Sequence, residues 1–472
     1  MIKRKFVLFF LLFGCVVGLI SQKNELNQIT KFTNDLGLAS NYVYQIIQDK
    51  KGFIWIGTEE GLNKFDGKNF SEFTTKPGRY SLSHNRAQTV MLAPDGNIWV
   101  GTSDGINIYD YKSDSVIRVR TNTAPLKLKY NDITFLTTSK NGKTTWIGTY
   151  GNGIHYYNWD KKEFDRFKLP LIHGVKEPLL VMSILEDDSK RLWIGTQNNG
   201  LYKYDLEQRT FEYCPLKEQN LFVQAIYQDS YRRLWIGTNK GCYIYNETTD
   251  LFDPVTYPEG LKTNSINVFR EDHQGKLWIG SDLFLMNFTT RSFSKTEKFN
   301  YQIYTHGESS FTLNCPSISS ILVDRDNNIW IGTVWGGVNM MQGVQSKFKL
   351  YKQEPDIPFS LPKTPITGIC KDNEGNILLS TNTKGIYKMN STTLQFRKFA
   401  TSNNYAGYDF QTILNDNQGK IWLGTFKNGV VVMDKNGIEK THFTQNPLDA
   451  NSLPDNDVRC LYQSENHNIW VA

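Results

Sequence analysis

The sequence predicts an all-β protein built as a β-propeller of four-stranded blades. The main observation is a pentapeptide of the form Ile-Trp-Ile-Gly-Thr, first seen at Ile54–Thr58, which recurs every 42 to 52 residues. A second observation is that each repeat holds four short segments rich in β-branched and aromatic residues, bounded by Gly, Asn and Asp. No segment carries the 3.6-residue spacing of an amphipathic helix over a useful length. Repeated units of this kind are typical of propeller blades, because one unit alone cannot bury its apolar face.

The first complete repeat shows the order of the four predicted strands. An apolar stretch at residues 43–47 is closed by a polar, Asp-containing turn at 49–52. The strand at 54–58 follows, a short turn leads into residues 61–66, and the alternating segment 69–73 is the fourth strand. Gly, Asn and Asp between the segments predict tight turns.

A tryptophan in the second predicted strand marks nearly every repeat, and Leu378 fills the one position where it is missing. The tryptophans are Trp55, Trp99, Trp146, Trp193, Trp235, Trp278, Trp330, Trp422 and Trp470. We expect them to be core residues wedged between neighbouring blades. The glycine of the motif predicts a place where a side chain would obstruct close packing.

Ten repeats exceed the four to eight blades usual for one propeller, so we predict two rings. Isolated strands at 28–33 and 347–352 are each expected to close a ring by pairing with its last blade. The predicted domains are a seven-bladed β-propeller over 22–344 and the first blades of a second, truncated propeller over 345–472. Because the sequence stops at Trp470-Val471-Ala472, within a motif strand, we expect a fragment of a longer polypeptide.

The N-terminus predicts export. Lys3, Arg4 and Lys5 precede an apolar run at residues 6–20, which is short for a membrane span. We therefore predict a signal peptide over 1–21. A lipoprotein site at Cys15 is a weaker alternative, because the apolar run continues past it.

Charge and cysteine content exclude several classes of protein. The 53 Lys and Arg residues nearly balance the 47 Asp and Glu residues, which gives no case for nucleic acid or a membrane surface as a partner. The five cysteines beyond the leader are an odd number without metal-ligand spacing. A disulfide framework is therefore not indicated.

Three patterns suggest chemistry but have structural explanations. Residues 101–105 match Gly-x-Ser-x-Gly, yet they fall at a strand-to-strand turn instead of the strand-to-helix turn of a hydrolase. Residues 324–328 resemble the start of a calcium loop without its later Gly and Glu. His84 and His306 occupy comparable loops, which leaves a shared metal or acid–base site open. We predict no catalytic residue, no metal ligand and no cofactor.

A ligand site is predicted on the face formed by the loops before each inner strand and the turns after each Gly-Thr, because such loops carry function on a rigid scaffold. Aromatic planes beside amides and a guanidinium suit sugar rings and their hydroxyls. The candidates are Asn41, Tyr42, Asn85, Arg86, Asn131, Tyr150, Asn199 and Trp335. Each has the alternative of being an ordinary exposed loop residue. Trp335 is the strongest candidate, since it stands outside the structural tryptophan register.

The repeat also resembles a known family. The pattern Asn-x-Val-x-x-Ile-x-Gln-Asp-x-x-Gly-x-Ile-Trp-Ile-Gly-Thr-x-x-Gly-Leu-Asn-x-x-Asp, at Asn41–Asp66, resembles the two-component regulator propeller repeat. That family builds the periplasmic sensor region of hybrid two-component histidine kinases. The resemblance covers essentially all of 22–472. It implies oligosaccharide sensing, and it carries over no invariant site residue.

We therefore expect a periplasmic sensor region that detects an oligosaccharide ligand and regulates a downstream kinase module in the same full-length chain. A homodimer, inner-membrane anchoring of the full-length protein and no nucleic acid partner are expected with it. The chain itself is not expected to be an enzyme. Two alternatives stay open: a secreted propeller enzyme, such as a polysaccharide lyase or hydrolase, and a scaffold for protein partners.

Overall fold

The computed structural model describes most of the chain from residue 28 onward as β-strands and turns. The described residues are 28–472 except 79, 122–127, 168–178, 198, 217–220, 256–264, 294–299, 308, 310, 344–350, 354–358, 400–404 and 406. The predicted signal peptide lies outside them. Two 3-10 turns, η1 (Asn34–Leu36) and η2 (Thr290–Ser292), are present, and none of the described helices is long and apolar enough to cross a bilayer. The chain divides into two compact units, residues 1–346 and 347–472.

The described residues of the first unit form seven four-stranded antiparallel sheets, six of them from consecutive strands. The first contains β2 (Val43–Gln48), β3 (Ile54–Thr58), β4 (Gly61–Phe65) and β5 (Phe70–Phe73). The second contains β6 (Ala87–Leu92), β7 (Ile98–Thr102), β8 (Gly105–Asp110) and β9 (Ser115–Val119). The third contains β10 (Ile133–Thr138), β11 (Thr144–Thr149), β12 (Ile154–Asn158) and β13 (Glu163–Arg166). The fourth contains β14 (Val181–Glu186), β15 (Arg191–Thr196), β16 (Leu201–Asp205) and β17 (Phe211–Cys214).

The remaining sheets of the first unit complete the set. The fifth contains β18 (Val223–Gln228), β19 (Leu234–Thr238), β20 (Gly241–Asn246) and β21 (Leu251–Pro254). The sixth contains β22 (Ile266–Glu271), β23 (Lys276–Ser281), β24 (Leu285–Thr289) and β25 (Tyr301–Tyr304). The seventh joins β1 (Ile29–Phe32) to β26 (Ile318–Val323), β27 (Ile329–Thr333) and β28 (Val338–Met341).

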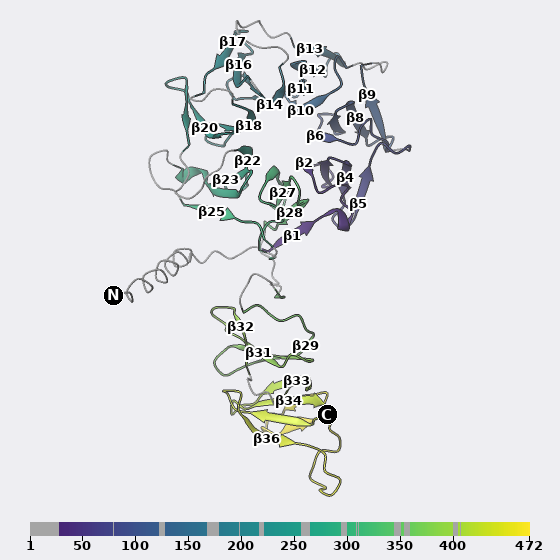
Figure 1. Ribbon diagram of the computed structural model, residues 1–472, viewed down its shortest axis with the longest axis vertical. Helices are drawn as coiled ribbons and strands as arrows, with labels where there is room; N and C mark the ends of the chain where they lie inside the picture. Colours follow the sequence, from purple (N-terminus) through teal and green to yellow (C-terminus); the bar gives the residue numbers. More distant parts are fainter. Residues whose placement is uncertain are drawn as a thin grey trace, which may run out of the picture. The chain divides into compact units, whose positions relative to one another are not determined.

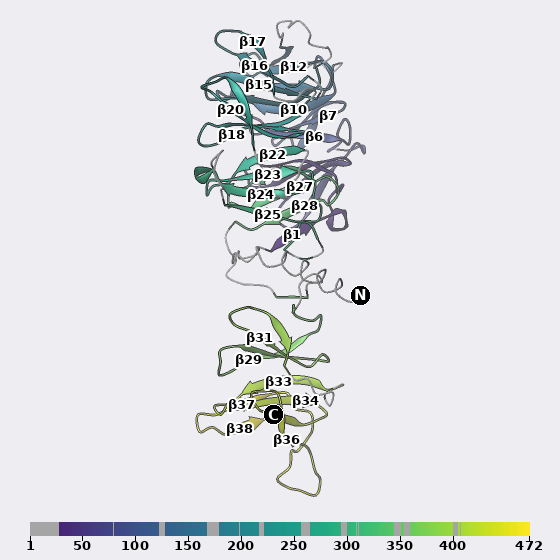
Figure 2. The same ribbon diagram turned by 60° about the vertical axis from the view of Figure 1, so that its left-hand side comes forward.

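These sheets form a closed ring, the propeller predicted from the repeats (Figure 1). The innermost strand of each sheet contacts that of the next, and β26 of the seventh sheet contacts β2 of the first. The ring is closed by β1, which pairs antiparallel with β28 in a register running from Ile29 opposite Met341 to Phe32 opposite Val338. The predicted role of this N-terminal strand is confirmed. Figure 2 shows the same sheets from the side, with β1 beside β28.

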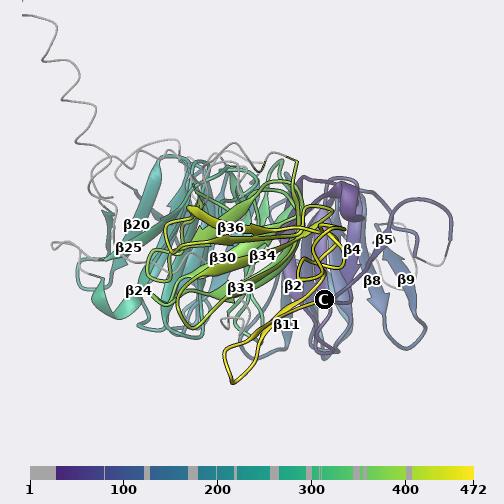
Figure 3. The ribbon, with the colours of Figure 1, turned by 90° about the horizontal axis from the view of Figure 1, so that it is seen from below.

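The second unit contains two four-stranded sheets and a two-stranded one within its described residues. The four-stranded sheets are β29 (Ile366–Lys371), β30 (Ile377–Thr381), β31 (Ile386–Met389) and β32 (Phe396–Lys398), then β33 (Asp409–Asn415), β34 (Ile421–Phe426), β35 (Val430–Met433) and β36 (Glu439–Phe443). The last is β37 (Leu461–Gln463) with β38 (Ile469–Val471). Contacts of β29 with β33, and of β33 with β37, repeat the blade-to-blade order of the ring. Figure 3 shows strands of the two four-stranded sheets, β30 of the first and β33, β34 and β36 of the second. Leu378, which replaces a tryptophan, is fully buried in this unit.

The motif tryptophans of the first unit form the core between blades, as expected. Trp55 is fully buried against Val90 and Ile98 of the next sheet, and Trp330 packs against Val43 across the closure. The motif glycines allow this approach: a Cβ on Gly57 would lie 2.4 Å from the carbonyl oxygen of Ala87 in the second sheet. Burial of aromatic surface between blades supplies the main apolar stabilisation of the ring.

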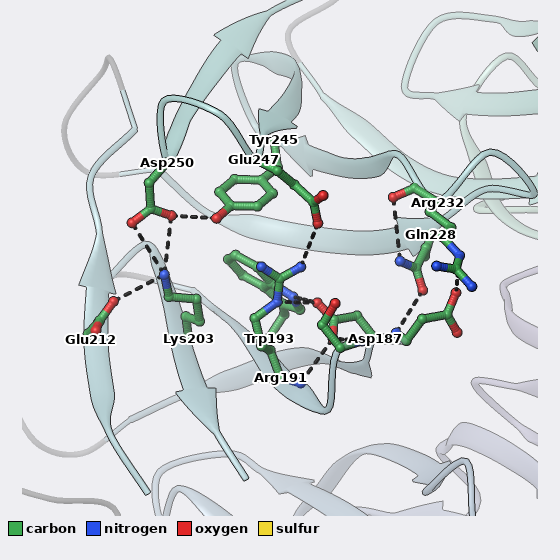
Figure 4. Close-up of polar contacts among 12 residues, drawn as sticks. Asp187, Arg191, Trp193, Lys203, Glu212, Gln228, Arg232, Tyr245, Glu247 and Asp250 are labelled. Atoms are coloured by element: carbon green, nitrogen blue, oxygen red, sulfur yellow. Dashed lines mark hydrogen bonds and ion pairs between the residues drawn. The ribbon is translucent and has the colours of Figure 1, made fainter. Parts of the chain in front are cut away.

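One buried carboxylate organises the turn between the first two strands of most sheets. Asp187 Oδ1 accepts hydrogen bonds from the backbone N–H groups of Ser189 and Arg191, both at 2.9 Å. Its Oδ2 accepts a hydrogen bond from the indole N–H of Trp193 at 2.8 Å and forms an ion pair with Arg191 Nε at 2.7 Å (Figure 4). The same bond from carboxylate to indole joins Asp49 to Trp55, Asp229 to Trp235, Asp272 to Trp278, Asp324 to Trp330 and Asp416 to Trp422. The predicted polar turns are thus tied to the core, because buried polar groups need partners.

A second recurring contact connects one turn to the following sheet. The backbone N–H of the residue after the turn aspartate donates to the last side chain of the next innermost strand, as that of Asp188 does to Gln228 Oε1 at 3.2 Å. The other pairs are Ser230 with Glu271, Arg325 with Gln48 across the closure, and Asn417 with Gln463 in the second unit. Arg325 adds hydrogen bonds from its guanidinium to the carbonyls of Asp49 and Lys50. The ring is therefore closed by two sets of contacts, the hydrogen bonds of Arg325 to the first sheet and the pairing of β1 with β28.

A buried histidine takes a position that other sheets fill with asparagine. Asn63, Asn107 and Asn339 accept backbone N–H groups of the preceding loops at 2.8 to 3.0 Å. In the third sheet this position is His155, which is 3% exposed, with Nε2 2.9 Å from Asn152 Oδ1. Burial lowers the pKa of His155 to about 4, and the charge of nearby Arg166 acts in the same direction. The imidazole of His155 is therefore neutral in the folded protein at neutral pH.

The closing strand generates the first prediction. A chain that begins at residue 34 lacks β1, leaves β28 as an open edge and removes the stacking of Phe32 on Trp330. Its unfolding temperature in a calorimetric scan is expected to fall well below that of a chain that begins at residue 28. Equal unfolding temperatures for the two chains would contradict closure by this strand.

The second sheet lacks the turn carboxylate, which generates another prediction. Ala93 stands six residues before Trp99, and the buried indole N–H of Trp99 has no hydrogen-bond partner among the described residues. Ala93→Asp is expected to raise the free energy of unfolding by about 1 kcal/mol, since bonds to a charged acceptor outweigh its burial here. Ala93→Asn is the matched control, because its single acceptor oxygen is uncharged and cannot serve the turn N–H groups and the indole N–H together, as the two carboxylate oxygens do at Asp187. Denaturant melts in which the two variants behave alike would rule out the missing bond as the cause.

His155 predicts a pH effect on stability. Its folded pKa of about 4 lies below the ordinary value of 6.5, so the unfolded chain takes up the proton first as pH falls. The contribution is complete above pH 6.5 and is lost as pH falls toward 4. His155→Asn is expected to match the wild type at pH 7.5 and to lose less stability at pH 4.5, by on the order of 2 kcal/mol. Identical pH dependence of the two unfolding temperatures would show that His155 does not titrate on unfolding.

Candidate functional site

The first unit encloses a cavity of about 1110 Å³ along the axis of its ring. Residues of all seven innermost strands, β2, β6, β10, β14, β18, β22 and β26, line it. Figure 1 looks along this axis, with the innermost strands around the centre. A concave space lined by every blade is the default place for a ligand in such a scaffold.

A β-bulge at the same place in every innermost strand sets the lining near one end of the cavity. Each of these strands shifts register against its neighbour after the first residue, and the residue skipped by the pairing lines the cavity. In order around the ring these residues are Tyr44, Gln88, Thr134, Met182, Gln224, Asn267 and Ser319. Bulges re-aim side chains in this way and are frequent beside functional sites. The bulges thus place seven different side chains, most of them polar, on a regular frame.

Three aromatic rings form a continuous patch beside this end of the cavity, which we call the aromatic ledge (Tyr42, Tyr44 and Trp335). The ring of Tyr42 lies 5.0 Å from that of Trp335 in an edge-on arrangement and 4.9 Å from that of Tyr44. Trp335 is 72% exposed. It belongs to the turn after β27 in the seventh sheet, whereas Tyr42 and Tyr44 belong to the first. The ledge therefore crosses the seam at which the ring closes.

Charged and hydrogen-bonding groups adjoin the aromatic ledge. Arg86 Nε donates to the Tyr44 hydroxyl at 2.7 Å and lies 3.4 Å from Glu59 Oε2. The Tyr44 hydroxyl donates to the same carboxylate. Burial, together with the hydrogen bond to Glu59, raises the pKa of Tyr44 above its ordinary value, so the phenol keeps its proton. This network fixes the orientation of Tyr44 and balances the charge of Arg86.

A carboxylate lies further around the rim. Asp132 directly precedes β10 and lines the cavity, and its Oδ1 accepts from Gln88 Nε2 at 3.3 Å. The same Gln88 nitrogen donates to Ser103 Oγ at 3.0 Å. Burial raises the pKa of Asp132, while the Gln88 hydrogen bond and the charges of Arg86 and His84 oppose the rise. Gln88 is thus held between two sheets and presents Asp132 to the cavity.

The structure brings part of the predicted site together. Tyr42, Arg86 and Tyr150 line the cavity, and Trp335 contacts Tyr42 at its edge. Asn199, in the turn after β15, is not among the lining residues; its backbone N–H donates to Thr196 Oγ1.

The other three predicted amides secure loops. Asn41, Asn85 and Asn131 occupy equivalent positions before innermost strands, and none of them lines the cavity. Their Oδ1 atoms accept the backbone N–H groups of Asn34, Thr75 and Thr121 at 2.8 to 2.9 Å. A ligand role for these amides stays a prediction, and their hydrogen bonds show a structural use.

Several lining residues were not singled out in the sequence. Tyr44, Gln88 and Asp132 belong to this group. The signal that could have found them is positional: residues at the bulge, and directly before the strand, vary from repeat to repeat while their neighbours stay apolar. Variable residues on an invariant frame indicate where specificity is built.

The lining favours binding over acid–base chemistry. Among its described residues the charged ones are Arg86, Asp132 and Arg270, and histidine does not occur. In the part of the chain that the structure describes, no three His, Cys, Asp or Glu side chains gather as metal ligands. The arrangement offers an aromatic surface, amides, hydroxyls and one carboxylate, Asp132, that forms no ion pair among the described residues.

Comparisons with known proteins address the family. Residues 37–60, 81–104, 217–240, 260–282, 312–335 and 452–472 match the family model of the two component regulator propeller. A stretch of 67 residues is 37% identical to histidine kinase P4 of Formosa agariphila, which is 14% of this chain and 5% of that protein.

Solved structures extend the comparison to the whole fold. The extracellular domain assigned to a hybrid two component system of B. thetaiotaomicron is 26% identical with a TM-score of 0.63, over 94% of this chain and 64% of that one. The chain therefore spans less than two thirds of that relative. Virginiamycin B lyase of Staphylococcus aureus, 14% identical with a TM-score of 0.50 over 67% of this chain and 99% of its own, shows the propeller fold alone. Six segments of the chain thus match the two component regulator propeller repeat, which confirms the resemblance seen in its sequence.

Proposed function

We propose that this chain is the ligand-binding sensor region of a hybrid two-component signal transduction protein, and that it binds an oligosaccharide at the aromatic ledge. The observation that carries the proposal is the exposed Trp335 ring, which packs edge-to-face against Tyr42 at the end of the axial cavity. An aromatic ring with this exposure has little protein to pack on. Family membership and the similarity to an extracellular domain of a hybrid two component system support the sensor role.

The chemistry of the rim supports a carbohydrate ligand. Flat apolar rings suit the apolar faces of sugars, and the neighbouring Arg86, Gln88 and Asp132 supply donors and acceptors for hydroxyl groups. Because the aromatic rings belong to the seventh and first sheets and these polar groups to the second and third, the proposed ligand is an extended molecule of more than one sugar unit.

Signalling would follow from a shift in population. In this proposal the ligand favours one arrangement of two copies in a homodimer, and a downstream histidine kinase in the same full-length chain responds. Export by the predicted signal peptide and inner-membrane anchoring of the full-length protein belong to the same proposal. The similarity to histidine kinase P4 supports the kinase context.

Trp335→Ala separates binding from stability. The variant is expected to unfold within about 1 kcal/mol of the wild type, as exposed substitutions usually do, and to lose at least about tenfold in affinity for the bound glycan. Glycan-array screening of the purified chain identifies a bound glycan, and isothermal titration of that glycan measures the loss.

Tyr231→Ala is the matched control for this variant. Tyr231 is 53% exposed but lies in the turn between β18 and β19, at the opposite end of the strands. Its removal is expected to leave affinity unchanged. Unchanged affinity after Trp335→Ala would remove the aromatic ledge from the binding site, and an array with no bound glycan would contradict the carbohydrate ligand.

A further inference from the structure

The rim of the cavity carries one carboxylate whose charge is not balanced by an ion pair. Tyr42, Arg86 and Asp132 each directly precede an innermost strand and line the cavity from three successive sheets. The charge of Arg86 is balanced by Glu59 at 3.4 Å. Asp132 contacts Gln88 at 3.3 Å, and no Lys or Arg of the described residues lies within ion-pair distance of it. The two charges of the rim are therefore not equivalent.

The surroundings of Asp132 leave it with spare hydrogen-bonding capacity. A carboxylate has about four acceptor positions. The hydrogen bond from Gln88, the one contact of this side chain among the described residues, uses a single position on Oδ1. The side chain is half-buried at the edge of the cavity, where fewer waters can reach it than on an open surface. A ligand that enters the cavity must replace those waters with donors, because an unpaired buried acceptor is costly.

We propose that Asp132 makes the rim selective for uncharged glycans, by accepting hydrogen bonds from two neighbouring hydroxyl groups of one sugar ring. The inference rests on the proposed function, and it adds the charge class of the ligand. Hydrogen bonds to an ionised acceptor are roughly twice as strong as those between neutral groups. Two hydroxyls on adjacent ring carbons can point at one carboxylate together, which fixes the orientation of the sugar.

An acidic glycan would be rejected at the same place. A uronate or sulfate group brought close to Asp132 meets a like charge in surroundings where Coulomb repulsion is stronger than in water. Arg86 offsets this repulsion only in part, since its Nε donates to Tyr44 and it forms an ion pair with Glu59. The selectivity thus comes from one residue and not from the net charge of the chain.

The test compares the wild-type chain with Asp132→Asn on an array that carries neutral, acidic and amino-sugar glycans. The wild type is expected to bind neutral members and to reject the acidic ones. Asp132→Asn keeps the size of the side chain but removes its charge, so it is expected to lose about tenfold in affinity for the best neutral glycan, equivalent to one charge-assisted hydrogen bond. It is also expected to accept acidic relatives of that glycan that the wild type rejects.

Asp104→Asn is the matched control. Asp104 lies in the turn between β7 and β8, forms an ion pair with Arg120 at 2.5 Å and does not line the cavity. This variant loses the same charge from the same side of the ring, and the glycan preference is expected to stay that of the wild type. Unfolding temperatures of both variants show that they remain folded.

The outcomes separate the two proposals. Wild-type binding of an acidic glycan, or of an amino sugar in preference to every neutral glycan, leaves the sensor function standing and overturns the selectivity. Unchanged preference and affinity in Asp132→Asn would overturn it as well. An array on which the wild-type chain binds nothing contradicts the proposed carbohydrate function itself.

Discussion

The buried aspartate of the turn between the first two strands is the interaction on which most blades of the propeller depend. A carboxylate such as Asp187 satisfies two backbone N–H groups of its own turn and the indole N–H of the tryptophan six residues later. Burying a charge without partners would cost several kcal/mol, so the three bonds allow a tight turn to be placed inside the core. The tryptophan held in this way fills the space between its own sheet and the next. Turn geometry and blade-to-blade packing are therefore set by one side chain.

The contacts between sheets extend this local order around the ring. The hydrogen bonds from a turn N–H to the next innermost strand, such as that of Ser230 with Glu271, join sheets that follow each other in the sequence. The hydrogen bond of Arg325 with Gln48 joins the seventh sheet to the first. Because the frame repeats, the bulge position always lines the cavity whatever residue occupies it. A rigid frame with one free position per sheet lets the lining change without cost to the fold. Each of the seven blades thus contributes one bulge residue whose identity can change independently of the others.

The aromatic ledge lies at the seam where the ends of the ring meet. Trp335 belongs to the last sheet and Tyr42 to the first, and these sheets are joined by β1, by the Arg325 hydrogen bonds and by packing. A ligand held by both residues would bind only the closed ring, and it would stabilise closure by mass action. Binding and ring stability are therefore linked at this site, whereas a ligand held by one sheet would not link them.

The repeat period, the glycines and the isolated first strand were sufficient to predict the propeller, because the interactions that build a blade are local and recur. The turn at Asp49 and the tryptophan at Trp55 are only six residues apart, so their pattern is visible in the chain.

The site was less predictable than the fold. Trp335, Tyr42, Arg86 and Tyr150 could be found as unusual loop residues, but the roles of Asn85 and Asp132 could not. Asn85 bonds a backbone group ten residues away, and Asp132 meets Gln88 only after two sheets pack together. The sequence by itself determined the blades, while tertiary packing decided which side chains face the cavity, because a bulge takes its direction from the strand pairing around it.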